Sequence, residues 1–195
     1  MQEFLRIAHR GYSARYPENT LLAFAKAIEA GVDMIELDLH FSCDGELVVI
    51  HDDRIDRTSD GRGRVAELTL TDLRKYNYNS GMTNCGFVAI PTLAEVIELA
   101  DNRVLLNIEI KKDPKKKVRI EKNLVDLLKG KDFIDRVIVS SYDCKILTEI
   151  KEIAKEIRTG LIYDASSKRF CEEVREFDIS SVHPETAVVD AIDLR

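Results

Sequence analysis

The sequence predicts an α/β fold of the TIM-barrel type, in which a parallel sheet curls into a barrel and helices cover its outside. Two observations lead to this prediction. The hydrophobic period alternates between two and 3.6 along the chain, as expected of successive strand and helix units. Acidic and histidine side chains recur near the ends of short apolar strand patterns, which is where such barrels carry their functional groups.

Seven strands are predicted, each a short apolar or alternating run that ends at a turn or a polar residue. They span about residues 5–9, 34–41, 47–50, 104–110, 137–139, 158–162 and 179–182. Helices follow several strands and begin near residues that suit a helix start, namely Asn19, Thr92, Pro114, Asp143 and Thr186. Residues 52–102 lack a clear strand, so we expect an inserted segment of loops and short helices within a single domain, residues 1–195.

The barrel is expected to lack its eighth strand and its final helix, because the chain has 195 residues and no eighth strand pattern. A doubly wound open sheet is the competing architecture. Along the second strand, Glu36 and Asp38 face away from Ile35 and Leu37. Helices cover both faces of a central strand in an open sheet, which then reads as apolar throughout. A polar inner face therefore favours the barrel.

Composition excludes several classes of function. The net charge of -6 argues against nucleic acid or an anionic membrane as the main partner. The 4 cysteines are far apart and show no metal-binding or C-x-x-C spacing, which indicates a reducing, cytoplasmic location. We expect neither a signal peptide nor membrane insertion, because no basic segment followed by an apolar one opens the chain and no long apolar run occurs.

Three carboxylates form a candidate metal site. Glu36 and Asp38 lie two residues apart on one predicted strand and share a face, and Glu109 has the same phase on another strand. A Glu-x-Asp pair alone is more often the solvated face of an edge strand. Three acids that converge in a buried sheet need a positive partner, and oxygen ligands favour Mg²⁺ or Ca²⁺.

Two histidines and two basic residues occupy similar positions. A lone histidine at a strand end is usually an ordinary polar cap, but His9 and His51 both end strands beside the acids. Imidazole titrates near neutral pH and can act as a general acid or base. Arg10 and Lys111 would supply positive charge for phosphate oxygens. The combination predicts phosphoryl chemistry.

Seven short motifs, in this order and spacing, resemble the glycerophosphodiester phosphodiesterase family. They are His9-Arg10-Gly11, Pro17-Glu18-Asn19-Thr20, Glu36-Leu37-Asp38, His51-Asp52, Arg57-Thr58 with Gly61-x-Gly63, Pro91-Thr92-Leu93 and Glu109-Ile110-Lys111. The resemblance runs from about residue 6 to 184, and the combination is far more specific than any single motif.

The resemblance implies a TIM barrel that hydrolyses glycerophosphodiesters to glycerol 3-phosphate and an alcohol such as choline or ethanolamine, as part of lipid and glycerol metabolism. The attacking hydroxyl would come from the glycerol 2-position or from water. Roles are implied for seven residues, with acid and base catalysis by His9 and His51, a divalent ion on Glu36, Asp38 and Glu109, and phosphate contacts from Arg10 and Lys111.

One departure from the family concerns the end of the barrel. Family members continue into an eighth strand with a Trp-Thr-Val-Asn-like sequence, whereas this chain has no tryptophan. The first and last strands would then have open edges, so we expect either a shortened chain or a homo-oligomer in which a second copy covers the edge. Two other functions stay open, namely a lysophospholipase D-like phosphodiesterase and a remnant that binds phosphodiesters without turnover.

Overall fold

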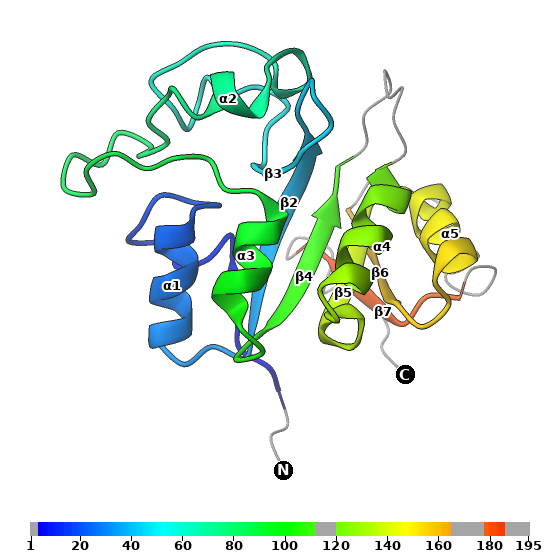
Figure 1. The fold of residues 1–195 in the computed structure, drawn as a ribbon. Coiled ribbons are helices and arrows are strands. Elements are labelled where there is room, and N and C mark those ends of the chain that lie inside the picture. Colours follow the sequence, from blue (N-terminus) through cyan, green and yellow to red (C-terminus); the bar gives the residue numbers. More distant parts are fainter. Residues whose placement is uncertain (1–3, 112–119, 165–177, 186–195) are drawn as a thin grey trace.

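The computed structural model describes residues 4–111, 120–164 and 178–185. In this part of the chain a curled sheet of parallel strands is covered by helices on its outer face, which confirms the predicted TIM-type fold class (Figure 1). The parallel strands follow the order β1-β2-β4-β5-β6-β7. Their bounds are β1 Ile7–His9, β2 Met34–Phe41, β4 Leu105–Ile110, β5 Val137–Ser141, β6 Arg158–Tyr163 and β7 Ser181–Pro184.

The remaining strand, β3 (Leu47–Val49), differs from the prediction that counted it among the barrel strands. It runs antiparallel to β2, with Leu39 opposite Val49, and so forms a hairpin beside the parallel path. The reason is the short connection over residues 42–46, since a parallel pair needs a crossover of a dozen or more residues. Gly45 has a φ of 86°, which suits this tight turn.

Helices pack on the outer face of the sheet in two pairs (Figure 1). They are α1 (Leu21–Glu29) with α3 (Leu93–Ala100), and α4 (Ile120–Gly130) with α5 (Cys144–Ile153). Two helices begin near the predicted residues. Thr20, next to Asn19, caps α1 by accepting a hydrogen bond from the Ala23 N–H, and Thr92 caps α3 in a capping box with Glu95. The helix start predicted near Pro114 and the helix predicted over 186–194 lie outside the described residues.

Between β3 and α3 the chain forms loops with two short helices, η1 (Val65–Glu67) and α2 (Leu70–Leu73). A separate apolar cluster holds this segment on β3. Its buried members are Val48, Ile50, Ile55, Val65, Leu73, Tyr78 and Ile90. Figure 1 shows the segment beyond the carboxyl end of β2, where it forms one side of the barrel mouth. A short η2 helix (Ile134–Arg136) precedes β5.

The two faces of β2 differ in character, as the alternation of apolar and acidic residues along the strand predicts. Ile35, Leu37 and Leu39 are at most 1% exposed and join the core between the sheet and the helices. Glu36 and Asp38 lie on the opposite face, so the outward face stabilises the fold while the inward face carries charge. Among the described residues, no helix combines the length and apolar character needed to cross a bilayer.

Candidate active site

Three carboxylates from two neighbouring strands meet at the barrel mouth. Parallel pairing places Asp38 on β2 directly beside Glu109 on β4, and Glu36 lies two residues earlier on the same face of β2. One oxygen from each lies within 4.8 Å of the others. All three side chains are buried, and Asp38 is 0% exposed. We call Glu36, Asp38 and Glu109 the carboxylate cluster.

The protonation of the carboxylate cluster reflects burial and the proximity of like charges. Burial, reinforced by the charge of Asp38, raises the pKa of Glu36 to about 8. Burial also raises the pKa of Glu109 above its ordinary value. Burial opposes ionisation of Asp38 as well, but Lys111 and a hydrogen bond from Asn19 outweigh it and lower the pKa of Asp38.

Basic groups compensate for only part of this negative charge. Lys111 Nζ lies 2.7 Å from Asp38 Oδ1 and 2.5 Å from Glu109 Oε1, and Arg10 Nε lies 3.4 Å from Asp38 Oδ2. Glu36 has no comparable side-chain cation within hydrogen-bonding distance among the described residues. Its nearest basic side chain is His9, whose Nε2 lies 3.8 Å from Glu36 Oε2. The donor set, three hard oxygen ligands in a buried site, fits a divalent cation such as Mg²⁺ or Ca²⁺.

The loop after β1 directs His9 and Arg10 toward the cluster. Arg10 and Gly11 both have positive φ, 57° and 78°, so the chain turns sharply at the end of the strand. A Cβ on Gly11 would lie 2.9 Å from Ala23, which excludes other residues there. The Arg10 N–H donates to Glu36 Oε2 at 2.9 Å. Burial, together with the charge of Arg10, lowers the pKa of His9.

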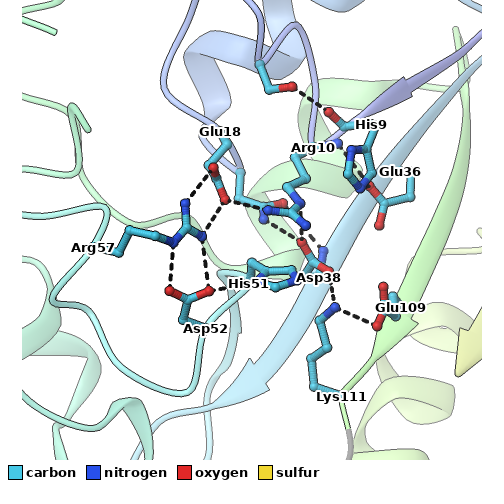
Figure 2. Close-up of polar contacts among 12 residues, drawn as sticks. His9, Arg10, Glu18, Glu36, Asp38, His51, Asp52, Arg57, Glu109 and Lys111 are labelled. Carbon is cyan, nitrogen blue, oxygen red and sulfur yellow. Dashed lines mark hydrogen bonds and ion pairs between the residues drawn. The ribbon is translucent and has the colours of Figure 1, made fainter. Parts of the chain in front are cut away.

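The β2–β3 hairpin places the second histidine, His51, in the site. Because the strands are antiparallel, each step along β3 moves back toward the middle of β2, and the Ile50 N–H donates to the Asp38 carbonyl at 3.0 Å. His51 therefore arrives beside the carboxylate cluster (Figure 2). His40 on β2 holds this turn, since its Nε2 lies 3.1 Å from the His51 carbonyl oxygen.

All seven site residues predicted from the sequence lie together at this one place (Figure 2). The structure adds four residues for which no role was predicted. Asn19 Nδ2 donates to Asp38 Oδ2 at 2.7 Å and so orients a ligand of the carboxylate cluster. The other three are Glu18, Asp52 and Arg57, which we call the arginine cluster. All four lie within the matched motifs, but motif membership alone assigns no contact.

In the arginine cluster each acid is paired. Arg57 donates from Nε to Asp52 Oδ2 at 2.7 Å and from Nη1 to Glu18 Oε2 at 2.9 Å. These bonds to Arg57 lower the pKa of Asp52 to about 2, and they lower the pKa of Glu18 as well. Asp52 Oδ1 in turn lies 2.7 Å from His51 Nδ1, which orients the ring.

Comparison with known proteins gives a consistent result. The pattern that defines the Glycerophosphoryl diester phosphodiesterase family matches residues 9–193. The glycerophosphodiester phosphodiesterase of Caldanaerobacter subterraneus is 40% identical over 183 residues, which cover 92% of this chain and 75% of that relative. Human glycerophosphodiester phosphodiesterase 1 is 31% identical over 161 residues, covering 80% of this chain and 48% of that protein.

Solved structures show the same fold. An Oleispira antarctica phosphodiesterase, solved in complex with the product sn-glycerol-3-phosphate, superposes with a TM-score of 0.83 at 30% identity. That alignment covers 91% of this chain and 73% of the other. The glycerophosphodiester phosphodiesterase of Thermotoga maritima gives a TM-score of 0.74 at 32% identity, covering 94% of this chain and 75% of the other.

Proposed function

Because the chain belongs to the glycerophosphoryl diester phosphodiesterase family, whose members hydrolyse glycerophosphodiesters to glycerol 3-phosphate, we propose that it does so by histidine acid and base catalysis beside a divalent cation. The observation that carries this proposal is the carboxylate cluster, whose oxygens lie within 4.8 Å of one another between two histidines. Mg²⁺ and Ca²⁺ both suit its oxygen ligands.

The proposed ligands of the cation are Glu36, Asp38 and Glu109. When bound, such an ion supplies positive charge that stabilises the negative charge developing on phosphate oxygens. Arg10 and Lys111 lie beside the carboxylate cluster and would bind the phosphate of the substrate. Their charges act in a partly buried site, where they are screened less than in water.

The two histidines would move the protons. The lowered pKa of His9 keeps its imidazole neutral near neutral pH, which suits a base that takes the proton of the attacking hydroxyl, from water or from the glycerol 2-position. His51 would then give a proton to the departing alcohol oxygen as the bond from phosphorus to that oxygen breaks. Its Nδ1 is engaged by Asp52, so the transfer would use Nε2.

The test is the release of glycerol 3-phosphate from glycerophosphocholine. We expect release that stops on chelation and returns when Mg²⁺ or Ca²⁺ is added. His9→Ala and His51→Ala should each lower turnover by about two orders of magnitude or more. Undiminished activity in both variants would remove the proposed mechanism, and binding of the substrate without any release would favour a phosphodiester-binding protein instead.

A lysophospholipase D-like activity is tested by comparing the release of choline, a product common to both substrates, from glycerophosphocholine and from a dispersion of lysophosphatidylcholine. We expect faster hydrolysis of glycerophosphocholine, and a preference for the dispersion would reverse that assignment.

The proposal also includes a role in lipid and glycerol metabolism and a cytoplasmic location. Cys43 and Cys85 are free, which suits a reducing compartment.

We also propose that a second copy covers the open edge of the sheet. Among the described residues, β1 and β7 each pair with only one neighbouring strand, and Ile7 on β1 is 52% exposed. Open strand edges favour association with another chain. Sedimentation should show a dimer or a larger homo-oligomer, whereas a strictly monomeric and stable protein would exclude this arrangement.

A further inference from the structure

Contacts between charged side chains connect the two ends of the site. Glu18 Oε1 accepts hydrogen bonds from Arg10 Nη1 at 3.0 Å and from Arg57 Nη2 at 2.8 Å. Arg57 also donates to both oxygens of Asp52, and Asp52 Oδ1 contacts His51 Nδ1. A continuous run of contacts therefore leads from the proposed phosphate-binding Arg10 to the proposed acid His51 (Figure 2).

We propose that Glu18 and Arg57 are positioning residues, which fix His51 and Arg10 relative to each other so that proton transfer and phosphate binding occur at one substrate. This inference rests on the proposed function, since it concerns the two groups to which that function gives roles. Neither Glu18 nor Arg57 needs to touch the substrate. They act through the residues that do.

The hydrogen bonds of Arg57 indicate why it acts indirectly. Its Nε and Nη2 donate to Asp52 at 2.7 and 3.0 Å, and its Nη1 and Nη2 donate to Glu18 at 2.9 and 2.8 Å. The guanidinium thus holds two carboxylates in paired contacts, a geometry that only arginine provides. These four bonds use four of the five N–H groups of the guanidinium, so a phosphate could make paired contacts with Arg57 only by displacing a carboxylate.

The same bonds tie together two loops that are distant in sequence. Glu18 lies in the loop between β1 and α1, and Arg57 lies 39 residues later, in the loop after β3. Those loops carry Arg10 and His51, which follow different strands, β1 and β3. Misplacement of a catalytic group by about 1 Å can lower a rate about 100-fold. Contacts that fix the distance between the two loops should therefore keep the rate of the reaction high.

Substitution of Arg57 and of Glu18 should have different kinetic effects. Arg57→Lys keeps the charge but loses the paired contacts, and we expect kcat for glycerophosphocholine to fall about 10- to 100-fold with KM nearly unchanged. Glu18→Gln also releases Arg10, so KM should rise in addition to the fall in kcat. The matched control is Arg64→Lys, because Arg64 pairs with Asp53 at 2.7 Å in the same loop but stands outside this run of contacts.

A double-mutant cycle separates positioning from a general loss of stability. Asp52→Asn combined with Arg57→Lys should lower kcat no further than the more severe single change, since both changes disrupt the same contact between Arg57 and Asp52. Additive losses would overturn the inference, as would losses in Arg57→Lys and Arg64→Lys that simply follow a lower unfolding temperature. An unchanged kcat in Arg57→Lys, with wild-type turnover intact and His51→Ala inactive, would overturn the positioning role alone and leave the proposed function standing.

A readout that does not need turnover tests the same claim. The proton between His51 Nδ1 and Asp52 should give a downfield NMR resonance, which we expect to shift or disappear in Arg57→Lys and to remain in Arg64→Lys. If the wild type released no glycerol 3-phosphate, the proposed function would fail while this resonance still decided whether Arg57 orients His51. A resonance identical in the wild type and both variants would contradict the inference.

Discussion

The carboxylate cluster and the arginine cluster contain the same kind of acid in opposite electrostatic states. In the carboxylate cluster, burial and like charge raise the pKa of Glu36 to about 8. In the arginine cluster, the hydrogen bonds from Arg57 lower the pKa of Asp52 to about 2. The acids of the carboxylate cluster lie on strands and are only partly neutralised, by Lys111 and Arg10. The acids of the arginine cluster lie on loops, and each is paired with Arg57.

This difference distinguishes a ligand-binding site, the carboxylate cluster, from a set of residues that position their neighbours, the arginine cluster. Three buried acids on rigid strands are costly unless a cation joins them, so their presence points to a ligand. Acids that already share an arginine need no ligand, and their contacts instead fix the geometry of their neighbours. Four predictions test this distinction, beginning with the largest expected effect.

Glu109→Gln should abolish cation-dependent activity with little effect on the fold. The amide has nearly the same shape but removes one of three negative ligands, so we expect turnover to fall about 100-fold or more and affinity for Mg²⁺ to fall with it. Calorimetry with Mg²⁺ and the glycerol 3-phosphate assay measure both effects. The control is Glu98→Gln on the surface, where Glu98 pairs with Lys131. A Glu109→Gln variant with wild-type affinity for Mg²⁺ would show that the carboxylate cluster is not a cation site.

Asn19→Gly should weaken cation binding by about tenfold or more, because Asp38 loses the amide that orients it. Glycine is the right replacement, since Asn19 has a φ of 55° and glycine tolerates that conformation. Asn102→Gly, at a φ of 56° on the surface, controls for the backbone change. Equal affinity for Mg²⁺ in the two variants would mean that Asn19 has no part in the site.

Cation binding near neutral pH should release about one proton. Glu36, with a pKa of about 8, is protonated in the cation-free protein at neutral pH and must lose its proton to become a ligand. Affinity for Mg²⁺ should therefore increase with pH until about pH 8 and then level off. Calorimetry in buffers of different ionisation enthalpy counts the protons, and a heat of binding independent of the buffer would contradict this expectation.

The smallest effect concerns acid stability. The pKa of Asp52 is lowered in the folded state from 3.8 to about 2, so its pairing stabilises the fold above pH 3.8 and this contribution is lost as the pH falls toward 2. Arg57→Met should accordingly lower the unfolding temperature at neutral pH, and the gap between variant and wild type should close in acid. A gap of constant size from neutral pH down to about pH 2 would exclude ionisation of Asp52 as its cause.

Sequence alternation was sufficient to predict the faces of β2 and β4, because side chains on a strand must alternate and only one face could be apolar. The three strand acids follow directly from that pattern. The prediction counted β3 among the barrel strands, whereas β3 runs antiparallel to β2; the short connection over residues 42–46 already favours that direction. The contacts of Glu18 and Arg57 were not predictable, since loops have no period that places two residues 39 positions apart side by side.

Diffraction from crystals soaked with Mn²⁺ tests the central claim most directly, because Mn²⁺ occupies oxygen sites built for Mg²⁺ or Ca²⁺ and scatters anomalously. The account predicts one strong anomalous peak in contact with carboxylate oxygens of Glu36, Asp38 and Glu109, with Lys111 moved aside from Asp38. A peak elsewhere on the protein, or none at saturating Mn²⁺ while the enzyme still turns over, would contradict it.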